Sequence, residues 1–279
     1  MHQAWSYQSA IQHAQSQLNQ VSAKLEAEIL LCHLLKISRV QLYTWPEREL
    51  TEQQAKDFFE LINQRQQGQP VAYLTGQREF WGLTLEVNPY TLIPRADTET
   101  LVESALQKAS TYPKPKILDL GTGSGAIALA LASELNQAEI HAVDKSHGAL
   151  NTAHHNAKML NLSVQFHQGN WFEPVRDQLF DLILSNPPYI ESADPHLSQG
   201  DLRFEPSQAL ASGTDGLDDL RVIITQATAH LNPQGWLMVE HGYNQAHAVA
   251  DLFQKSAYQA IELRTDLAGQ PRVTIGQKP

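Results

Sequence analysis

The stretch "ILDLGTGSGAIALALA", residues 117–132, decides the fold of this chain. It begins as a short, mostly apolar run typical of a buried strand and ends as a run typical of a helix. Between the two runs lie Gly121, Gly123 and Gly125. Glycine lets a backbone turn sharply and approach a ligand closely, and the amides at the start of the helix would face that ligand. The stretch therefore predicts a strand, a ligand-binding loop and a helix in succession.

The same succession of strand and helix continues from residue 115 towards the C-terminus. Further strands are predicted in "EIHAVD", "SVQFH", "DLILS" and "GWLMVEH", and most of them are separated by helical segments. The last two runs, "AYQAIELR" and "PRVTIGQ", predict an antiparallel pair. Such alternation favours right-handed crossovers and an α/β fold with a doubly wound, mostly parallel sheet.

The chain divides into three parts by pattern. Residues 1–75 are predicted to form a small helical bundle, residues 76–93 a β-hairpin linker, and residues 94–279 the α/β domain. A chain of 279 residues is long enough for two domains. The helical bundle is either a purely structural domain or a module that recognises a substrate, and its sequence favours neither.

One helix of the bundle carries a specific expectation. In "SAKLEAEILLCHLLKI", the spacing of apolar residues places Leu25, Ile29 and Cys32 on one face, with Leu30, Leu34 and Ile37 alongside. We expect that face to pack against the other helices.

The composition limits the class of protein. The formal net charge is −10, from 20 Lys and Arg against 30 Asp and Glu, and no run of basic residues is present, so direct binding of nucleic acid is not expected. No apolar run reaches membrane-spanning length and the N-terminus lacks the pattern of a secretory signal, so we expect a cytoplasmic protein. With Cys32 as the only cysteine and no HExxH spacing among the histidines, neither a disulfide nor a metal site is expected.

Two acidic residues flank the glycine loop. Asp144 ends the next strand, about 20 residues beyond the loop, where a carboxylate can accept hydrogen bonds from both hydroxyls of a ribose. Asp119 precedes the loop, where it would suit a cationic amino group. A ligand with adenosine at one end and an amino acid at the other fits both acids, and S-adenosylmethionine is such a ligand. The plainer alternatives are a tight structural turn for the loop and a helix cap for Asp144.

A tryptophan follows the third predicted strand, in "QGNWFEP". Trp171 lies at the edge where open α/β sheets bind ligands, and its indole can cover the face of an adenine. A tryptophan of the core or of a domain interface is nearly as well supported by the sequence.

The fourth predicted strand ends in "SNPPY", beside the glycine loop. Methyl transfer to a planar nitrogen needs acceptors that hold its two N–H groups and offset the developing positive charge. Asn186 offers a side-chain carbonyl, and Pro187 offers a backbone carbonyl on a segment that Pro188 helps to keep rigid. The ring of Tyr189 can stack on a flat substrate. The plainer alternative is a strand terminated by proline.

These motifs resemble a known family. "LDLGTGSG", "AVD" and "SNPPY" are similar to the class I S-adenosylmethionine-dependent methyltransferases that act on planar nitrogen. The chain resembles one family within that class more narrowly, the protein-(glutamine-N5) methyltransferases of peptide chain release factors, or HemK/PrmC family. The sequences that carry this narrower resemblance are residues 70–99, 186–210 and 213–221. The resemblance extends from about residue 70 to the C-terminus, and the helical N-terminal region fits the layout of the family.

The resemblance implies a seven-stranded, Rossmann-like sheet, S-adenosylmethionine as cofactor and class 1 peptide chain release factors as protein substrate. It implies methylation of the glutamine in their Gly-Gly-Gln loop, in support of translation termination, with the helical domain docking the release factor. Residues expected to contact the cofactor are Asp119, Gly121, Thr122, Gly123, Ser124, Gly125, Asp144, Asn170, Trp171 and Asn186. Residues expected to hold the substrate glutamine are Asn186, Pro187, Pro188 and Tyr189, of which Asn186, Pro187 and Tyr189 would be catalytic.

Asn170 departs from the family pattern, in which we expect Asp. An Asn oxygen can still accept a hydrogen bond from the adenine amino group, but it adds no negative charge. Asn170→Asp is therefore expected to tighten the binding of S-adenosylmethionine.

Other roles stay open. A nucleic-acid base amino-methyltransferase, acting on adenine N6 or guanine N2, shares the Asn-Pro-Pro-Tyr motif but would need a basic groove. A non-catalytic S-adenosylmethionine-binding factor is a third hypothesis, which the intact motif opposes. Arg95, Arg203 and Glu205 either contact the release factor or pair with one another to hold loops, and we favour pairing. "EHGYNQ", residues 240–245, either borders the pocket or forms a surface loop.

Overall fold

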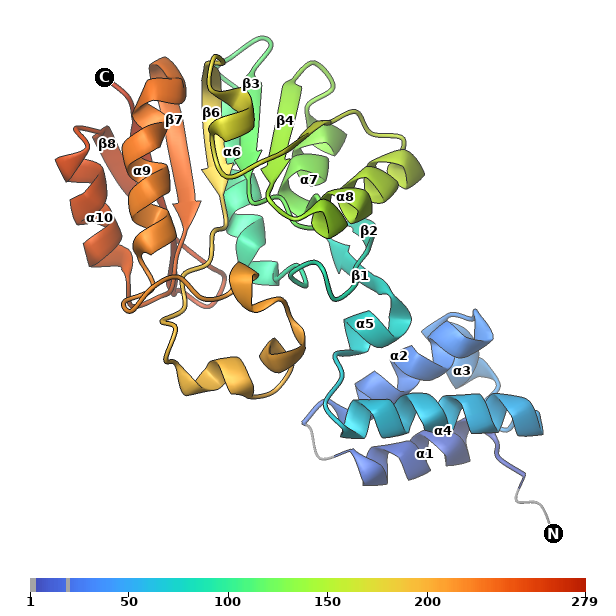
Figure 1. Cartoon of the computed structure of the whole chain (residues 1–279). Helices are drawn as coiled ribbons and strands as arrows, with labels where there is room; N and C mark the ends of the chain where they lie inside the picture. Colours follow the sequence, from blue (N-terminus) through green and yellow to red (C-terminus); the bar gives the residue numbers. More distant parts are fainter. Residues whose placement is uncertain (1–3, 19–20) are drawn as a thin grey trace. The chain divides into compact units, whose positions relative to one another are not determined.

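The computed structural model describes residues 4–18 and 21–279, and the chain forms two compact units, residues 1–76 and 77–279. The smaller unit is a bundle of helices (Figure 1). Its helices are α1 (Tyr7–Gln17), α2 (Ala23–Leu35), α3 (Arg39–Thr44), α4 (Glu52–Gln66) and α5 (Val71–Thr75). Helices α1, α3 and α4 each begin with a capping box, which satisfies backbone amides of the first turn.

The face of α2 that packs into the bundle differs from the predicted one. Leu30 and Leu31 are fully buried in the apolar core of the unit, whereas Leu25 is 42% exposed. Ile29 and Cys32 are half-buried. The placement of Leu25 on the packed face is therefore wrong. Because α2 carries apolar residues on several sides, their spacing did not select the face that meets α1 and α4.

The larger unit is built around a seven-stranded sheet, which confirms the predicted α/β fold. The strands, in chain order, are β3 (Lys116–Leu120), β4 (Glu139–Asp144), β5 (Gln165–Gln168), β6 (Phe180–Ser185), β7 (Leu231–Glu240), β8 (Gln259–Thr265) and β9 (Pro271–Gln277). Their order across the sheet is β5-β4-β3-β6-β7-β9-β8. The first five strands in that order are parallel, and β9 is antiparallel to both of its neighbours. Its pairing with β8 is the antiparallel pair that the C-terminal pattern predicts.

Helices cover both faces of this sheet (Figure 1). They are α6 (Glu99–Ala109), α7 (Ala126–Glu134), α8 (His147–Leu160), α9 (Asp218–His230) and α10 (Ala246–Lys255), with short 3-10 helices at Ala96–Thr98, Glu173–Val175, Pro195–Ser198, Leu202–Phe204 and Ser207–Ala209. Ile117 of β3 packs into a core with α6, α7 and α8. Its neighbour Leu118 packs into a second core with α9 and α10, because successive strand residues point to opposite faces.

A β-hairpin precedes this sheet in the chain. Its strands are β1 (Gln77–Phe80) and β2 (Leu83–Glu86), joined by a two-residue turn at Trp81 and Gly82. Phe80 and Leu85 are buried in the core formed with α6 and α7, so the hairpin is part of the larger unit. Residues 87–95 have no regular structure, although the sequence predicts strand there as far as residue 93.

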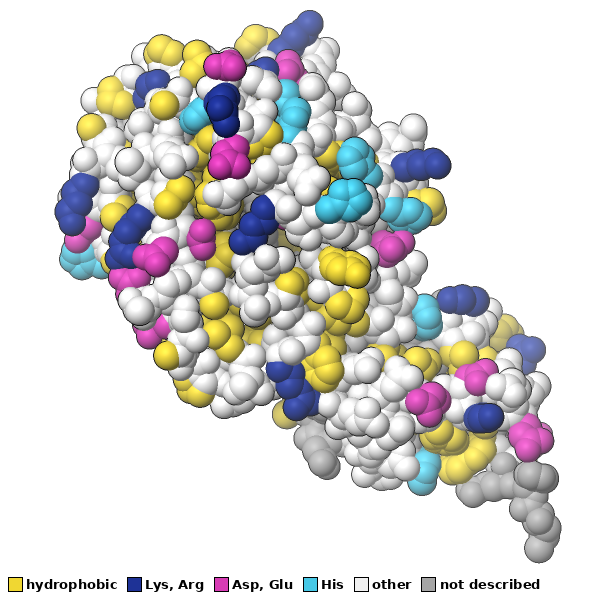
Figure 2. Space-filling model, viewed as in Figure 1, with side chains coloured by type: hydrophobic (Ala, Val, Ile, Leu, Met, Phe, Trp, Pro, Cys, Tyr) yellow, Lys and Arg dark blue, Asp and Glu magenta, His cyan; other side chains and the backbone are white. Residues whose placement is uncertain are grey.

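Three further observations on the described residues concern membrane-spanning helices, metal sites and surface charge. In the ranges 4–18 and 21–279, no helix has both the length and the apolar character needed to cross a membrane. Over the same ranges, no three His, Cys, Asp or Glu side chains converge as a metal site would require. Figure 2 shows Lys and Arg side chains scattered over the visible face among acidic and histidine side chains, without the continuous basic track that duplex binding uses.

Candidate active site

The strand order brings the glycine loop and the Asn-Pro-Pro-Tyr segment together. Strands β3 and β6 are adjacent and parallel, and Leu120 pairs with Ser185, so both loops begin side by side at one edge of the sheet. The Ser185 hydroxyl donates to the Leu120 carbonyl at 2.8 Å. After β3 the chain continues to β4 on one side, and after β6 it continues to β7 on the other. Open α/β sheets bind ligands at such a divergence.

The glycine loop has a left-handed backbone at three positions. The φ angles are +76° at Gly121, +57° at Gly123 and +85° at Gly125, values that favour glycine. The amides of Gly121 and Thr122 donate to the Val143 carbonyl at 2.8 and 3.0 Å, which ties the loop to β4. Helix α7 begins directly after the loop, so its N-terminal amides lie next to the crevice.

Asp144 is fixed at the end of β4 by backbone amides. Its Oδ2 accepts from the Gly123 N–H at 2.9 Å, and its Oδ1 accepts from the Ser146 N–H at 2.8 Å. Burial raises the pKa of Asp144, and these two hydrogen bonds oppose that rise. A carboxylate has about four lone-pair sites, so each oxygen keeps capacity to accept from a ligand.

A cavity opens at this edge of the sheet. The predicted residues that line it are Gly121, Gly123, Asp144, Asn170, Trp171, Asn186 and Pro188. The Trp171 ring forms a wall beside the loop, since a Cβ placed on Gly121 would lie 3.5 Å from it. The flat indole and the fixed carboxylate suit a small ligand that carries both an aromatic base and a sugar.

Sequence reasoning missed part of this wall. The further lining residues are Tyr90, Leu92, Lys145, Ser146, Ala149, Val143, Gly169, Pro206, Gln208 and Ala209. Tyr90 lies across the first turn of α8, where a Cβ on Gly148 would come within 2.6 Å of the Tyr90 ring. Tyr90 and Leu92 belong to the irregular residues 87–95, which have no periodic pattern to reveal which side chains point inward.

Four of the predicted cofactor residues lie behind the cavity wall. Asp119, Thr122, Ser124 and Gly125 do not line it. The Thr122 hydroxyl donates to Asp119 Oδ2 at 2.6 Å, and Oδ1 has no partner among the described residues. Burial raises the pKa of Asp119 to about 7. Asp119 does not line the cavity, and its contact with the amino group of the cofactor stays a prediction.

A second cavity adjoins the first. The two share Leu92, Asn186 and Ala209 as lining residues. Pro187 and Tyr189, which do not line the first cavity, line the second. Asn186 thus borders both spaces, as a group that acts between two ligands must.

Hydrogen bonds fix the polar side chains of the Asn-Pro-Pro-Tyr segment. Asn186 Nδ2 donates to Thr98 Oγ1 at 3.1 Å, which leaves Asn186 Oδ1 as the end that can meet a ligand. The Tyr189 hydroxyl donates to Glu240 Oε1, at the end of β7, at 3.3 Å. Burial, and then the charge of Glu240, raise the pKa of Tyr189, so the phenol stays neutral.

A buried ion pair holds the segments that border both cavities. Glu205 is fully buried, pairs with Arg95 and accepts from the Ile93 N–H at 2.9 Å. This confirms that Arg95 and Glu205 pair with each other. Arg203 lies instead over the ring of Phe204, with 4.9 Å between the guanidinium carbon and the ring centroid.

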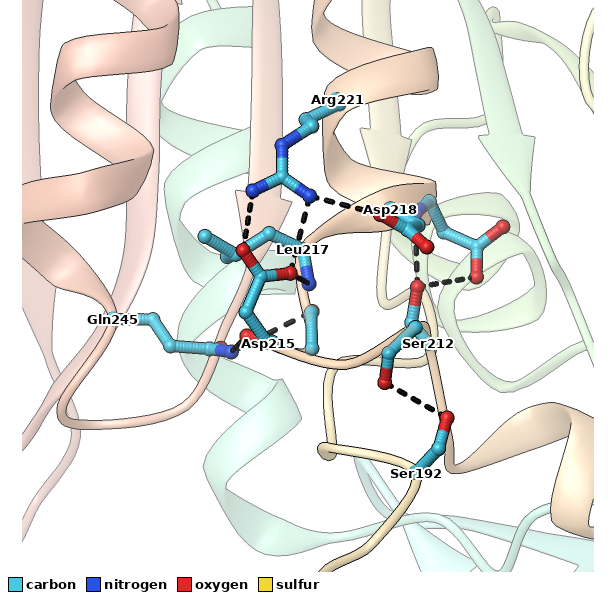
Figure 3. Close-up of polar contacts among 10 residues, drawn as sticks. Ser192, Ser212, Asp215, Leu217, Asp218, Arg221 and Gln245 are labelled. Carbon is cyan, nitrogen blue, oxygen red and sulfur yellow. Dashed lines mark hydrogen bonds and ion pairs between the residues drawn. The ribbon is translucent and has the colours of Figure 1, made fainter.

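The loops before α9 and α10 meet the backbone of Tyr189, and Figure 3 shows the polar contacts of the loop before α9 with Arg221 and Gln245. Gln245 Nε2 donates to the Tyr189 carbonyl at 2.9 Å. Gly216 faces the same carbonyl, and a Cβ there would lie 2.3 Å from the oxygen. Arg221 pairs with Asp215 and so closes the loop. None of residues 240–245, "EHGYNQ", lines either cavity.

Comparison with known proteins agrees with this geometry. Residues 9–76 match the PrmC N-terminal domain, and residues 96–204 match the methyltransferase small domain. The methyltransferase from Pyrococcus furiosus has the same fold, with a TM-score of 0.53 and 19% identity over 71% of this chain and 89% of that one.

Curated relatives match at much higher identity. The release factor glutamine methyltransferase of Xylella fastidiosa strain Temecula1 is 49% identical over 257 residues, which cover 92% of this chain and 94% of the relative. That of Vibrio cholerae serotype O1 is 48% identical over 275 residues, which cover 97% and 96%. Identity of this extent over nearly the whole length of both chains shows common descent and a common fold. The chain belongs to the family of release factor glutamine methyltransferases.

Proposed function

We propose that this chain transfers a methyl group from S-adenosylmethionine to the side-chain amide nitrogen, N5, of the glutamine in the Gly-Gly-Gln loop of class 1 release factors. The observation that carries the proposal is the position of Asn186 between the two cavities, with its amide oxygen available to a ligand. Methylation of a release factor would support translation termination and would take place in the cytoplasm.

The first cavity suits S-adenosylmethionine. Asp144 would accept from the ribose hydroxyls, Trp171 would cover the adenine, and Asn170 would accept from the adenine amino group. The glycine loop would lie against the amino-acid end, with Asp119 keeping the loop in shape from below. When bound there, S-adenosylmethionine supplies a methyl group that is already activated for transfer.

The second cavity suits the end of a glutamine side chain. The lone pair of an amide nitrogen is delocalised, so the nitrogen is a poor nucleophile. Asn186 Oδ1 and the Pro187 carbonyl would accept from its two N–H groups, orient it and offset the positive charge that develops. The ring of Tyr189 would lie against the flat amide. Among the described residues that line this cavity, none is a carboxylate or a histidine, so we assign the released proton to water.

We further propose that the helical unit docks the release factor. The match of residues 9–76 to the PrmC N-terminal domain supports this role. Val40, Tyr43 and Trp45, on and directly after α3, are large apolar side chains that stay exposed within the unit. Replacing Val40 and Trp45 with Ser should raise the KM for the release factor and leave the Kd for S-adenosylmethionine unchanged.

A nucleic-acid base is the alternative substrate. It would need a basic surface to neutralise phosphates, which a net charge of −10 disfavours. We therefore expect no direct binding of nucleic acid.

The decisive experiment offers labelled S-adenosylmethionine with an unmethylated class 1 release factor or with an unmethylated DNA duplex. Mass spectrometry should locate the methyl on the glutamine of the Gly-Gly-Gln loop, and DNA should stay unlabelled. Asn186→Ala should abolish transfer while largely sparing the Kd for S-adenosylmethionine. A methyl on DNA, or full activity of Asn186→Ala, would contradict the proposal.

A further inference from the structure

Two buried side chains behind the Asn-Pro-Pro-Tyr segment take no direct part in the proposed function. Thr98 ends the 3-10 helix before α6, and Glu240 ends β7. They are 4% and 1% exposed, and neither lines the cavities described above. Each nevertheless accepts a hydrogen bond from the motif. Asn186 Nδ2 donates to Thr98 at 3.1 Å, and the Tyr189 hydroxyl donates to Glu240 at 3.3 Å.

Thr98 and Glu240 also meet each other. The Thr98 hydroxyl lies beside the Glu240 carboxylate and favours its charged form. Glu240 Oε2 is buried and has no hydrogen-bond partner among the described residues, so it has the capacity to accept from a neighbouring hydroxyl. A carboxylate can only accept, so the single proton of the Thr98 hydroxyl must point to it. The Thr98 oxygen is then left as the acceptor for Asn186 Nδ2, as the structure shows.

We infer that Glu240, acting through Thr98, sets which end of the Asn186 side-chain amide faces the substrate. The inference rests on the proposed function, in which Asn186 Oδ1 must accept from an N–H group of glutamine. The nitrogen and oxygen of an Asn amide have nearly the same shape, so packing alone does not choose between them. The hydrogen bonds make the choice, because the carboxylate commits the amide nitrogen to Thr98 and the oxygen to the cavity.

Reversing the hydrogen bond between Thr98 and position 240 shows why a carboxylate is needed at that position. A neutral group at position 240 that donates a proton would make the Thr98 oxygen its acceptor. The Thr98 proton would then point to Asn186, whose amide would turn by half a rotation to accept it. Two N–H donors of Asn186 would face the N–H groups of the substrate, and donors repel donors. Thr98 and Glu240 are therefore positioning residues for the transfer.

The charged and titratable groups around Glu240 set the pH range of this device. Burial raises the pKa of Glu240 to about 7. Arg272 from β9 and the Tyr189 hydroxyl favour the charged form, and Asp97 beside Thr98 opposes it. His241, the next residue, has its pKa lowered by burial and stays neutral. The carboxylate is consequently lost as the pH falls through about 7, and the hydrogen-bond direction is lost with it.

Four variants test the inference in the full-length chain. Thr98→Val and Glu240→Gln keep the shape of the side chain, and each should lower kcat about 100-fold at pH 8, the size of effect seen when one positioned polar group is lost. Thr98→Ser keeps the hydroxyl and should restore kcat to within about 3-fold of the unmodified chain. Ser104→Ala removes another buried hydroxyl, on α6, and should leave kcat unchanged. The Kd for S-adenosylmethionine should be unaffected in all four.

Two further readouts separate positioning from a merely structural role. The kcat of the unmodified chain should fall below about pH 7, and Glu240→Gln should lack that step. The side-chain amide signals of Asn186, assigned in a ¹⁵N spectrum by their absence from Asn186→Ala, should shift in Thr98→Val without any substrate present. If Thr98→Val and Glu240→Gln fold and keep kcat within about 3-fold, or if the Asn186 signals do not move, the inference is wrong. Absence of glutamine methylation by the unmodified chain would instead refute the proposed function, and the amide signals would still decide the inference.

Discussion

Replacing Gly216 with Ala should lower turnover through the backbone of Tyr189. Gly216 has a φ of +72°, and an added Cβ would lie 2.3 Å from the Tyr189 carbonyl oxygen and 2.7 Å from Gln245 Nε2. The loop is braced on its far side by the ion pair between Arg221 and Asp215 (Figure 3). The added methyl group must therefore displace Tyr189, the loop, or both.

The displacement can be estimated from these contacts. Real Cβ atoms do not approach other heavy atoms closer than 3.0 Å, so a separation of 2.3 Å must open by at least 0.7 Å. A misplacement on the order of 1 Å in a positioned group costs up to about 100-fold in rate. Because the loop can take up part of the shift, we expect kcat to fall by about 10- to 100-fold. The left-handed backbone adds a strain of about 1 kcal/mol for any residue with a Cβ.

Gly269→Ala provides the matched control. Gly269 has a similar φ of +78°, in the turn between β8 and β9, but a Cβ there would meet nothing within 4 Å. Both variants should lose about 1 kcal/mol of unfolding free energy from backbone strain, measured by urea denaturation. Only Gly216→Ala should lose kcat in the transfer assay with a release factor. Neither should change the Kd for S-adenosylmethionine, because Tyr189 lines the second cavity and does not line the first.

Two results would refute this reasoning. If kcat of Gly216→Ala stays within about 2-fold of Gly269→Ala, the loop and not Tyr189 absorbs the strain. If the Kd for S-adenosylmethionine rises together with the loss of kcat, the two cavities are not separable in the way that their lining residues indicate.

Four other substitutions have measurable consequences. Asp144→Asn should raise the Kd for S-adenosylmethionine at least about 10-fold in calorimetry, because a charged acceptor for the ribose is lost. Arg95→Ala leaves Glu205 buried without its partner and should cost roughly 2 to 4 kcal/mol in urea denaturation, whereas Arg221→Ala, which breaks a half-exposed pair, should cost less than about 1 kcal/mol. Burial raises the pKa of Asp119 from its ordinary 3.8 to about 7, so the folded chain keeps a proton that the unfolded chain loses. The unfolding free energy should therefore fall as pH rises from about 4 to about 7, and Asp119→Asn should remove much of that fall when stability is measured across this range without ligand.

The parts of the fold that the sequence predicts are those with a local period. The glycine loop between β3 and α7 is predicted because three glycines interrupt two apolar runs, and the strand order then follows from general rules of α/β connection. The face of α2 is not predicted, because Leu25 and Leu30 are equally apolar and only the neighbouring helices distinguish them. The strand predicted as far as residue 93 is wrong beyond Glu86, because Asn88 bonds through its side chain to α8 and the Ile93 N–H bonds to Glu205, and residues 87–95 join no ladder.

Some residues of the candidate site could likewise be predicted from the sequence, and others could not. Asn186 and Trp171 could be named from the sequence because each follows directly on a strand that ends at the ligand-binding edge. Thr98 could not, since it lies 88 residues from its partner Asn186 and reads as an ordinary helix start. The position of Asp119 beside the loop predicts a contact with the ligand; its side chain is fully buried and does not line the cavity, and the contact stays a prediction. Position along a strand predicts which edge a residue reaches, and packing decides whether it faces the cavity.

The polarity of the second cavity gives a reason for two successive prolines. Pro187 and Pro188 have no backbone N–H, so the segment presents carbonyl oxygens without competing donors. Asn186 adds a further oxygen, because its nitrogen is committed to Thr98. Arg95, the charged residue at this cavity, is already paired with a buried carboxylate. Every polar group that the motif offers is then an acceptor, which suits the N–H groups of a glutamine and repels the oxygens of a glutamate. We therefore expect a release factor in which Glu replaces the loop glutamine to bind this cavity poorly, with an inhibition constant at least about 10-fold above that of the glutamine form.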